Sequence, residues 1–509
     1  MEGITIHSKR IKLYKNLILE EIEEIYLLLK KESKFEYHSE DRMKKGLVKK
    51  LFILVTSMST ILISIFLSDN TNNTVYQYLF LLPLLHGGGM IIFFSKAEEM
   101  LKYPSQKIIY ALFFIRNVVT PLLLVVNNYN LGIIIRDKSD VNYSIFLMLY
   151  ETFMVFLVLS QEIRLKKRNI SHKASFLDKK AFVQNLFNFL LISLAIITLI
   201  LWIIVPELKK SYGSIFDLTN LIQVANNVVK DDLATSTRAL ATIGGMLLTF
   251  CRIFVSLWIL YKIRMRSSSV KVGVFAALII TVFQMLFIGA QLMFAFYILF
   301  FIFFTTIKLW PGSRKFMSTF FGIIILFGII WVPFVKGGFT SWNSFLRDLG
   351  GYLQAYLPGI ANVAGTVRIE KVDLLKTGFA DIYTMIPFRN TLFGLQVENL
   401  SDIFNRYNNV AGQIMPLIGE SYHYFGPIFA PILSMMFAKG AIWANERMYT
   451  AKHIFSFGTY TMFMLYFSSM LICKNFILFG STFTSILLPM VIMCKFVGNE
   501  YDFINLKEH

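Results

Sequence analysis

The sequence predicts an all-α polytopic membrane protein, and three observations lead to this prediction. The chain has 509 residues, of which 55% are hydrophobic. Only 16% are charged, whereas about a quarter of the residues are charged in a typical soluble domain. Apolar runs of about 17 to 25 residues recur along the chain, and each is long enough to cross ~30 Å of hydrocarbon as a helix.

Twelve membrane spans are expected. They cover residues 51–68, 77–95, 108–126, 145–163, 181–205, 237–261, 271–288, 290–307, 316–334, 425–438, 453–472 and 476–494. These spans divide the chain into an N-terminal segment 1–50, a transmembrane bundle 51–334, an outer loop 335–424, a second set of spans 425–494 and a tail 495–509. The alternating ten-residue strands of a membrane barrel are not seen in the sequence.

The N-terminal segment includes a predicted amphipathic helix over residues 11–29. Ile11, Ile18 and Ile25 fall on one face at helical spacing, and acidic residues occupy the rest of the surface. Such a helix is expected to lie on the membrane or against the bundle. A solvated tail is the alternative interpretation.

The distribution of charge predicts the orientation in the membrane. The net charge of +18 lies mostly in short segments between apolar runs, which favours a topology signal over nucleic-acid binding. Seven basic residues lie between Arg164 and Lys180 alone, and the alternate segments on this side hold more than twice as many Lys and Arg as those opposite. Both termini are therefore expected in the cytoplasm of a cell whose cytoplasmic (inner) membrane holds the protein. No nucleic-acid partner is expected.

The 335–424 segment is much longer than the other loops between the expected spans. Long loops with apolar content of their own tend to be functional, and this one contains aromatic residues throughout, including Trp342, Tyr383 and Phe404. We expect it to be ordered and to cover an outward-facing cavity. A second outer loop, 206–236, has an amphipathic stretch at 215–229.

Two sequences in and after this loop resemble a known family. Residues 378–388 read GFADIYTMIPF and residues 413–427 read QIMPLIGESYHYFGP, immediately before the tenth expected span. They resemble the Wzy-type oligosaccharide repeat-unit polymerases of O-antigen and capsule synthesis, in which a Gly-(Gln/Glu)-Ser-Tyr-x-Tyr-Phe-Gly-like stretch follows the large outer loop. At motif level the resemblance covers about residues 365–430. The family's Arg with a Gly eleven positions on is not matched, since Arg368 to Gly378 falls one short.

The resemblance implies a GT-C-like bundle and a metal-independent glycosyltransferase. Such an enzyme polymerises oligosaccharide repeat units on undecaprenyl pyrophosphate, by en bloc transfer at the outer face of the cell membrane. The implied partners are this lipid-linked oligosaccharide, the bilayer, a chain-length regulator and a flippase. No cofactor is expected, because the lipid pyrophosphate already activates the donor sugar.

The expected reaction needs cations for the pyrophosphate and a base for the acceptor hydroxyl. Arginine can hold a phosphate with two parallel hydrogen bonds, and each loop arginine has a solvated surface charge as its alternative interpretation. The candidates for pyrophosphate or glycan binding are Arg252, Arg347, Arg368, Arg389, Arg406, Tyr422 and Tyr424. His423 is the candidate base because it is the one outer histidine among seven, and Glu420 and Asp381 are the alternatives.

Three charged residues fall inside expected spans. Arg116 and Glu151 lie at comparable depth on neighbouring antiparallel spans, which favours a structural ion pair. Arg252 has no evident partner in the sequence and is the better candidate for lining a lipid-pyrophosphate cavity. The run HGGG at residues 86–89 is similar to an esterase oxyanion motif, but its position in a span favours close helix packing.

Two other function classes compete with a polymerase. A lipid-linked oligosaccharide flippase or other transporter would usually have short loops on both sides and internal symmetry between its halves. An O-antigen-ligase-type transferase would pass the glycan to a different acceptor. The long 335–424 loop and the absence of a visible repeat favour the polymerase over the transporter.

Overall fold

The computed structural model describes most of the chain. The described residues are 37–94, 103–129, 133, 135, 137–165, 180–204, 235–286, 292–337, 341–369, 372–386, 397–410, 413–451, 453–473, 475, 480 and 482–495. Every regular element within these ranges is a helix, which confirms the all-α prediction. The predictions for residues 11–29, for residues 215–229 and for Arg389 lie outside the described residues.

The helices follow the order of the expected spans, with additional helices in the 335–424 segment. They are α2 (Tyr37–Thr71), α3 (Leu81–Phe94), α4 (Pro104–Phe114), the π-helix η2 (Ile115–Val119), α5 (Thr120–Val126), α6 (Lys138–Leu165), α7 (Lys180–Ile204), α10 (Thr235–Arg266), α11 (Val270–Leu286), α12 (Leu292–Leu309), the 3-10 helix η3 (Pro311–Ser313), α13 (Arg314–Gly337), α14 (Trp342–Tyr356), α15 (Ile360–Val367), α16 (Leu374–Met385), α18 (Leu400–Tyr407), α19 (Leu417–Phe429), α20 (Ile432–Thr450), α21 (Ile454–Cys473) and the π-helix η4 (Phe483–Leu487).

Several of these helices are long and apolar enough to cross a membrane. Among the described residues four qualify by length and composition, and a fifth does if α19 and α20 form one span. The four are Lys50–Thr71, Pro104–Val126, Lys138–Ser160 and Ile454–Ile472. Shorter apolar helices occur at Leu81–Phe93, Asn188–Leu201, Val270–Gln284 and Tyr297–Leu309. These apolar helices indicate a membrane protein, and each coincides with an expected span.

The tenth expected span, 425–438, does not form a straight helix. α19 and α20 meet within it at an angle of 108°. Gly426 has a φ of +75°, which glycine adopts at little cost, and Pro427 lacks the amide hydrogen that would continue the helical ladder. Hydropathy alone did not predict this bend, because an apolar run does not reveal a change of direction.

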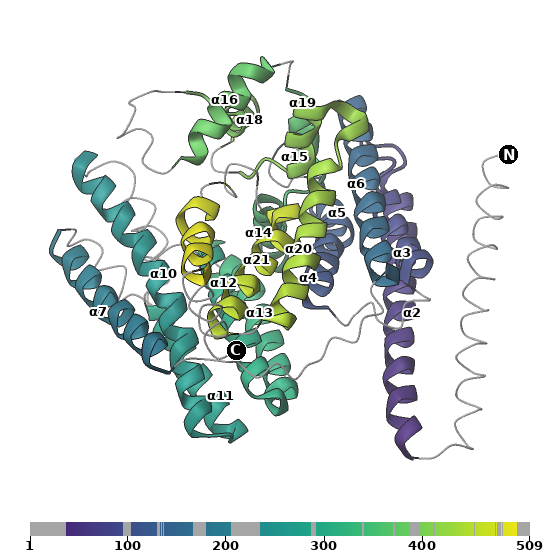
Figure 1. Cartoon of the computed structure of the whole chain (residues 1–509). Coiled ribbons are helices and arrows are strands. Elements are labelled where there is room, and N and C mark those ends of the chain that lie inside the picture. The colour runs from purple at the N-terminus through teal and green to yellow at the C-terminus, as the bar shows by residue number, and fades with distance from the viewer. Residues whose placement is uncertain are drawn as a thin grey trace.

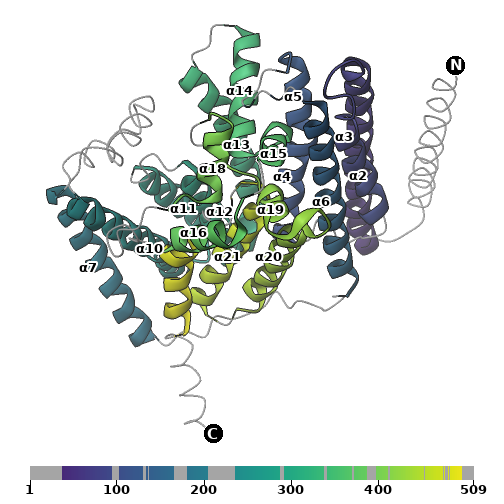
Figure 2. The same cartoon turned by 90° about the horizontal axis from the view of Figure 1, so that it is seen from above.

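The helices form one bundle (Figures 1 and 2). In both views α2 lies on one side of the described helices and α7 on the opposite side (Figures 1 and 2), and α3 packs against both α2 and α6. α6 packs against α3, α15 and α20, and α20 packs along α21. The largest apolar cluster lies among α10, α12 and α21 and includes Phe254, Ile302 and Phe457.

Glycines at residues 87 and 89 allow α3 to pack closely against its neighbours. The Gly87 carbonyl accepts a hydrogen bond from the Ser57 hydroxyl of α2 at 3.2 Å. A Cβ added to Gly89 would lie 2.8 Å from the Phe156 ring of α6. These contacts confirm the packing interpretation of the HGGG run.

The described part of the 335–424 segment is helical and packs on the bundle. α14 packs against α5 and α13, and α15 lies against both α6 and α19. Residues 360–366 of α15 are all buried. α16 and α18 lie together at one end of the bundle, at the top of Figure 1. The segment therefore supplies side chains to an interface with the membrane helices.

Candidate functional site

The two segments that resemble the polymerases meet where α19 contacts α15 and α16. Gly419 of α19 packs on α15 so closely that an added Cβ would lie 2.5 Å from the Thr366 methyl carbon. Any larger side chain would push the helices apart, so this glycine sets their separation. The close approach fixes the height at which the next turn of α19 presents Glu420, His423 and Tyr424.

His423 is held by the end of α15. Its Nε2 atom lies 3.1 Å from the Thr366 carbonyl oxygen. Because a carbonyl oxygen only accepts hydrogen bonds, Nε2 must carry the proton, and Nδ1 is then the nitrogen of the neutral ring that can accept one. Among the candidate bases, His423 is thus oriented by a backbone contact and is partly buried.

Asp381 of α16 joins three helices. The side chain is 3% exposed. Oδ1 accepts a hydrogen bond of 2.9 Å from the Leu400 amide in the first turn of α18. The Tyr424 hydroxyl of α19 donates to Oδ2. This carboxyl is therefore a structural link as well as a candidate base.

Burial raises the pKa of Asp381 to about 6. Desolvation disfavours the charged form and is the main cause, while the Leu400 amide partly opposes it and the nearby Asp402 adds to it. A carboxyl with a pKa near 6 can exchange a proton close to neutral pH, which an ordinary aspartate does poorly. The structure therefore adds a physical argument for Asp381 that the sequence did not contain.

The remaining candidates on α19 differ in their surroundings. Glu420 is completely buried, so a substrate could reach it only through a rearrangement of α19. The Tyr422 ring lies edge-on to Tyr143 of α6, with ring centroids 5.7 Å apart. It also lies 5.4 Å from the His423 ring. Tyr422 therefore packs between α6 and His423, whereas Tyr424 reaches α16.

Among the described loop arginines, Arg368 directly follows the helix that holds His423. It is the C-cap of α15, two residues after Thr366, and is exposed. Its Cζ lies 5.8 Å from the centroid of the Tyr407 ring of α18, and it lies within electrostatic range of Asp140 at the start of α6. Because the Arg368 guanidinium is exposed, it can bind an anionic ligand without first breaking a buried contact.

The other two described loop arginines have the surroundings of surface charges. Arg347 is exposed on α14. Arg406 is 70% exposed and forms an ion pair of 3.0 Å with Glu398. Exposed pairs of this kind contribute little to stability, so Arg406 fits the solvated interpretation.

Arg252 has a partner that the sequence did not reveal. Its Nε donates to the Gln284 side-chain oxygen at 2.8 Å and its Nη2 to the Gln284 backbone carbonyl at 2.7 Å. Both residues are buried, in α10 and α11. A single glutamine in an apolar run was the available signal. The expectation of an arginine without a partner was wrong, and the case for Arg252 as a pyrophosphate ligand is weaker.

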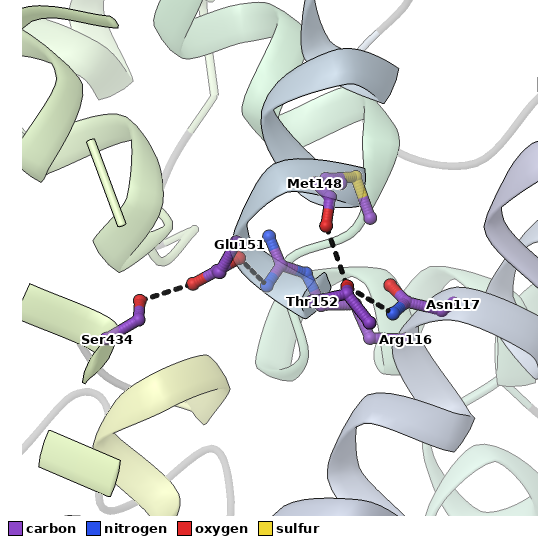
Figure 3. A network of polar contacts seen from close by, with 6 residues as sticks. All are labelled: Arg116, Asn117, Met148, Glu151, Thr152 and Ser434. Atoms are coloured by element: carbon purple, nitrogen blue, oxygen red, sulfur yellow. Dashed lines mark hydrogen bonds and ion pairs between the residues drawn. The ribbon is translucent and has the colours of Figure 1, made fainter. Parts of the chain in front are cut away.

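The predicted Arg116–Glu151 ion pair is confirmed (Figure 3). Nη1 of Arg116 lies 2.6 Å from Oε2 of Glu151, and both side chains are at most 1% exposed. Ser434 of α20 donates to the other carboxylate oxygen, so the pair links three helices. Beside it, Asn117 donates to Thr152 at 2.8 Å. Sequence reasoning missed Ser434, although it is a polar residue inside an expected span.

Among the described residues, no group of three His, Cys, Asp or Glu side chains could hold a metal ion. At the α15–α16–α19 junction, His423 and Asp381 are groups that can exchange a proton, and Arg368 is a nearby cation. The comparisons with known proteins return no match: neither a family model, nor a curated protein, nor a solved structure matches this chain.

Proposed function

We propose that this protein is a membrane glycosyltransferase that polymerises oligosaccharide repeat units carried on undecaprenyl pyrophosphate. One observation supports the proposal most directly. Asp381 and Tyr424 come from the two segments that resemble the polymerases, and they are hydrogen-bonded across 43 residues of sequence. This contact brings candidate residues of both segments to one place in the fold.

The proposed reaction transfers a glycan to a sugar hydroxyl. The acceptor oxygen attacks the anomeric carbon of the donor glycan, and the bond from that carbon to the pyrophosphate breaks. The hydroxyl proton passes to the base, and undecaprenyl pyrophosphate leaves with the bonding electron pair. The leaving group needs cationic stabilisation as its charge develops, and no nucleotide is consumed.

His423 is the proposed base, acting through Nδ1, and Asp381 is the alternative. Burial lowers the pKa of His423 below that of an ordinary imidazole, and the hydrogen bond to the Thr366 carbonyl partly opposes this shift, so the ring is neutral at neutral pH and Nδ1 can accept a proton. Asp381 has a raised pKa but already bonds to Leu400 and Tyr424. Glu420 remains a third candidate that would need α19 to move.

The cations in this proposal come from the 335–424 segment. Arg368 is the principal candidate for the pyrophosphate, and Arg389 is a second that follows the 378–388 sequence directly. The proposal includes a GT-C-like bundle of twelve spans with both termini in the cytoplasm. In that arrangement the α15–α16–α19 junction faces the outer leaflet, where the lipid-linked substrate is presented.

A transporter, such as a lipid-linked oligosaccharide flippase, is the second candidate. The observation that favours it is the Arg116–Glu151 pair, since charged residues inside spans often line transport paths. The two functions differ in product. A polymerase lengthens the glycan, whereas a flippase only changes the leaflet in which it is found.

Two substitutions at His423 test the base. His423→Gln retains an N–H that can donate to the Thr366 carbonyl but removes the acceptor nitrogen, whereas His423→Ala removes both. If His423 is the base, both variants should extend repeat units in proteoliposomes on the order of 10²–10⁴ times more slowly than wild type. Activity retained in His423→Gln and lost in His423→Ala would assign His423 a positioning role instead.

A matching substitution tests the alternative base. Asp381→Asn can still accept from the Leu400 amide through Oδ1, and its Nδ2 can donate to the Tyr424 hydroxyl, but it can no longer take a proton. Loss of activity in Asp381→Asn, with normal activity in His423→Gln, would transfer the role to Asp381.

A further inference from the structure

Three residues of α6 mark successive heights along the bundle. Tyr143 lies against Tyr422 of α19, Glu151 pairs with Arg116, and Phe156 follows five residues later. At 1.5 Å per residue, Tyr143 and Glu151 are about 12 Å apart along the helix, and Glu151 and Phe156 about 8 Å. The Arg116–Glu151 pair therefore lies between two levels of the bundle.

The level of Phe156 contains polar side chains. The His86 ring lies 5.4 Å from the Phe156 ring, and the Tyr110 ring lies 6.3 Å from it. His86 is completely buried and Tyr110 is 6% exposed. Within the described part of the chain, the two ring nitrogens of His86 have no hydrogen-bond partner, and the Tyr110 hydroxyl has none either.

Further polar side chains continue toward the end of the bundle where α4 begins and α20 ends. Tyr449 of α20 lies within electrostatic range of Tyr103, which precedes α4. Asn445 lies one turn before Tyr449 and Gln106 one turn after Tyr103, which puts them at similar height on helices that pack together. The Ser105 hydroxyl, Gln106 Oε1 and both polar atoms of the Asn445 amide are buried without a partner among the described residues.

The level of Tyr143, on the other side of the pair, also contains polar side chains. α19 presents Glu420, Ser421 and His423 there, and the first two are completely buried. The Ser421 hydroxyl has no partner among the residues that the structure describes. Polar groups therefore lie on both sides of the Arg116–Glu151 pair, in a region bounded by α3, α4, α6, α19 and α20.

The pair itself has unused donors. Arg116 donates through Nη1 to Glu151, while its Nε and Nη2 atoms are buried without a partner in the described ranges. Buried polar groups in folded proteins are almost always hydrogen-bonded, either to protein or to internal water. Because these atoms lie on both sides of the ion pair, on helices that pack against one another, water is the simplest common partner.

We propose that these side chains line two hydrated half-paths that meet at Arg116, Glu151 and Ser434, and that this triplet is the closed gate between them. The ligand of the path is water, together with the protons that a file of water molecules conducts. α4 and the π-helix η2, which continues it, supply Arg116, and α20 supplies Ser434. Ser434 follows the 108° bend between α19 and α20 by a few residues. A movement of the bend would therefore displace a member of the gate. This proposal does not rest on the polymerase assignment.

Cysteine accessibility from each side of the membrane tests the proposal. In a chain whose three native cysteines are replaced by alanine, Ser105→Cys and Ser421→Cys report on the two half-paths. A charged thiosulfonate is added to sealed spheroplasts and, separately, to inside-out vesicles. Thiols react as thiolates, which form only where water reaches them.

The expected result is complete labelling of each variant from one side only, with opposite sides for Ser105→Cys and Ser421→Cys. Asn445→Cys is a second reporter and should behave as Ser105→Cys. Ser468→Cys is the matched control, because Ser468 is completely buried and its hydroxyl bonds to the Met464 carbonyl of its own helix. It should be labelled only after denaturation.

Two results would overturn the proposal. If all the reporter cysteines stay unlabelled like Ser468→Cys until denaturation, the interior is dry. If the reporters of both half-paths are labelled from the same side, the ion pair is no barrier. In the Ser434→Ala background the barrier should weaken, so that Ser105→Cys is labelled from both sides. Unchanged one-sided labelling there would remove Ser434 from the gate.

Discussion

The Tyr424 hydroxyl donates a hydrogen bond to the Asp381 carboxyl, and this contact joins α19 to α16 at the base of the 335–424 segment. The same carboxyl accepts from the Leu400 amide at the start of α18. A carboxyl at a helix N-terminus is stabilised by the amide groups and the dipole of that helix. One buried side chain therefore holds the positions of three helices around His423.

The stability of this junction should depend on pH through Asp381. Its pKa is raised from 3.8 to about 6 in the folded protein, so the folded state binds the proton more tightly than the unfolded state. The resulting stabilisation is present in full below about pH 4 and is lost as the pH rises through 6, by at most about 3 kcal/mol. Thermal unfolding of detergent-solubilised protein should show a Tm that falls between pH 4 and 6 in wild type.

Asp381→Asn is the control for this pH dependence. The amide cannot ionise, so the fall in Tm between pH 4 and 6 should be smaller in this variant than in wild type. An identical pH profile for both proteins would mean that another group is responsible.

Breaking the Arg116–Glu151 pair should destabilise the bundle. Glu151→Gln leaves the Arg116 charge buried without its counter-ion, which costs about 3–5 kcal/mol. Replacing both residues with methionine removes both charges and should recover most of the lost stability, because an apolar pair of similar volume can substitute for a buried ion pair. Thermal unfolding in detergent measures both effects. A single variant as stable as wild type would show that the ion pair is not important for folding.

The pyrophosphate contact should depend on the shape of arginine as well as on its charge. If Arg368 holds phosphate with two hydrogen bonds, Arg368→Lys should lose nearly as much extension activity as Arg368→Ala. Arg406→Ala is the matched control, since Arg406 is also a loop arginine but pairs with Glu398 at the surface. Full activity in both Arg368 and Arg389 alanine variants, at normal expression, would exclude these arginines as the clamp.

The predicted orientation can be measured with reporter fusions. Because positive charge accumulates in the segments expected to be cytoplasmic, fusions after Asn73 and Trp342 should report the outside, and fusions after Lys173 and Glu508 the inside. A C-terminal fusion that reports the outside would contradict the count of twelve spans.

Some features of the structure followed from the sequence because they depend on local spacing. Apolar runs predicted the helices, and counting residues from the span ends placed Arg116 opposite Glu151. Other features depend on tertiary contacts that spacing does not contain. The contact of Arg252 with Gln284 is one example, and the contact of Asp381 with Tyr424 is another.

The bend between α19 and α20 was not predicted, for a different reason. Hydropathy measures whether a segment prefers lipid, and the residues on both sides of the bend do. The positive φ of Gly426, together with Pro427 and Pro431, decides the direction of the chain instead. These residues are visible in the sequence, but a search for apolar runs gives them no weight.

If the proposed function is right, the purified protein lengthens a lipid-linked glycan. The most direct measurement incubates wild-type protein in lipid with one repeat unit on undecaprenyl pyrophosphate, without added nucleotide, and separates the products by size. The predicted result is a ladder of products that differ by whole repeat units, with undecaprenyl pyrophosphate released at each step. Movement of the unit across the bilayer without any increase in its length would contradict the claim and favour a flippase.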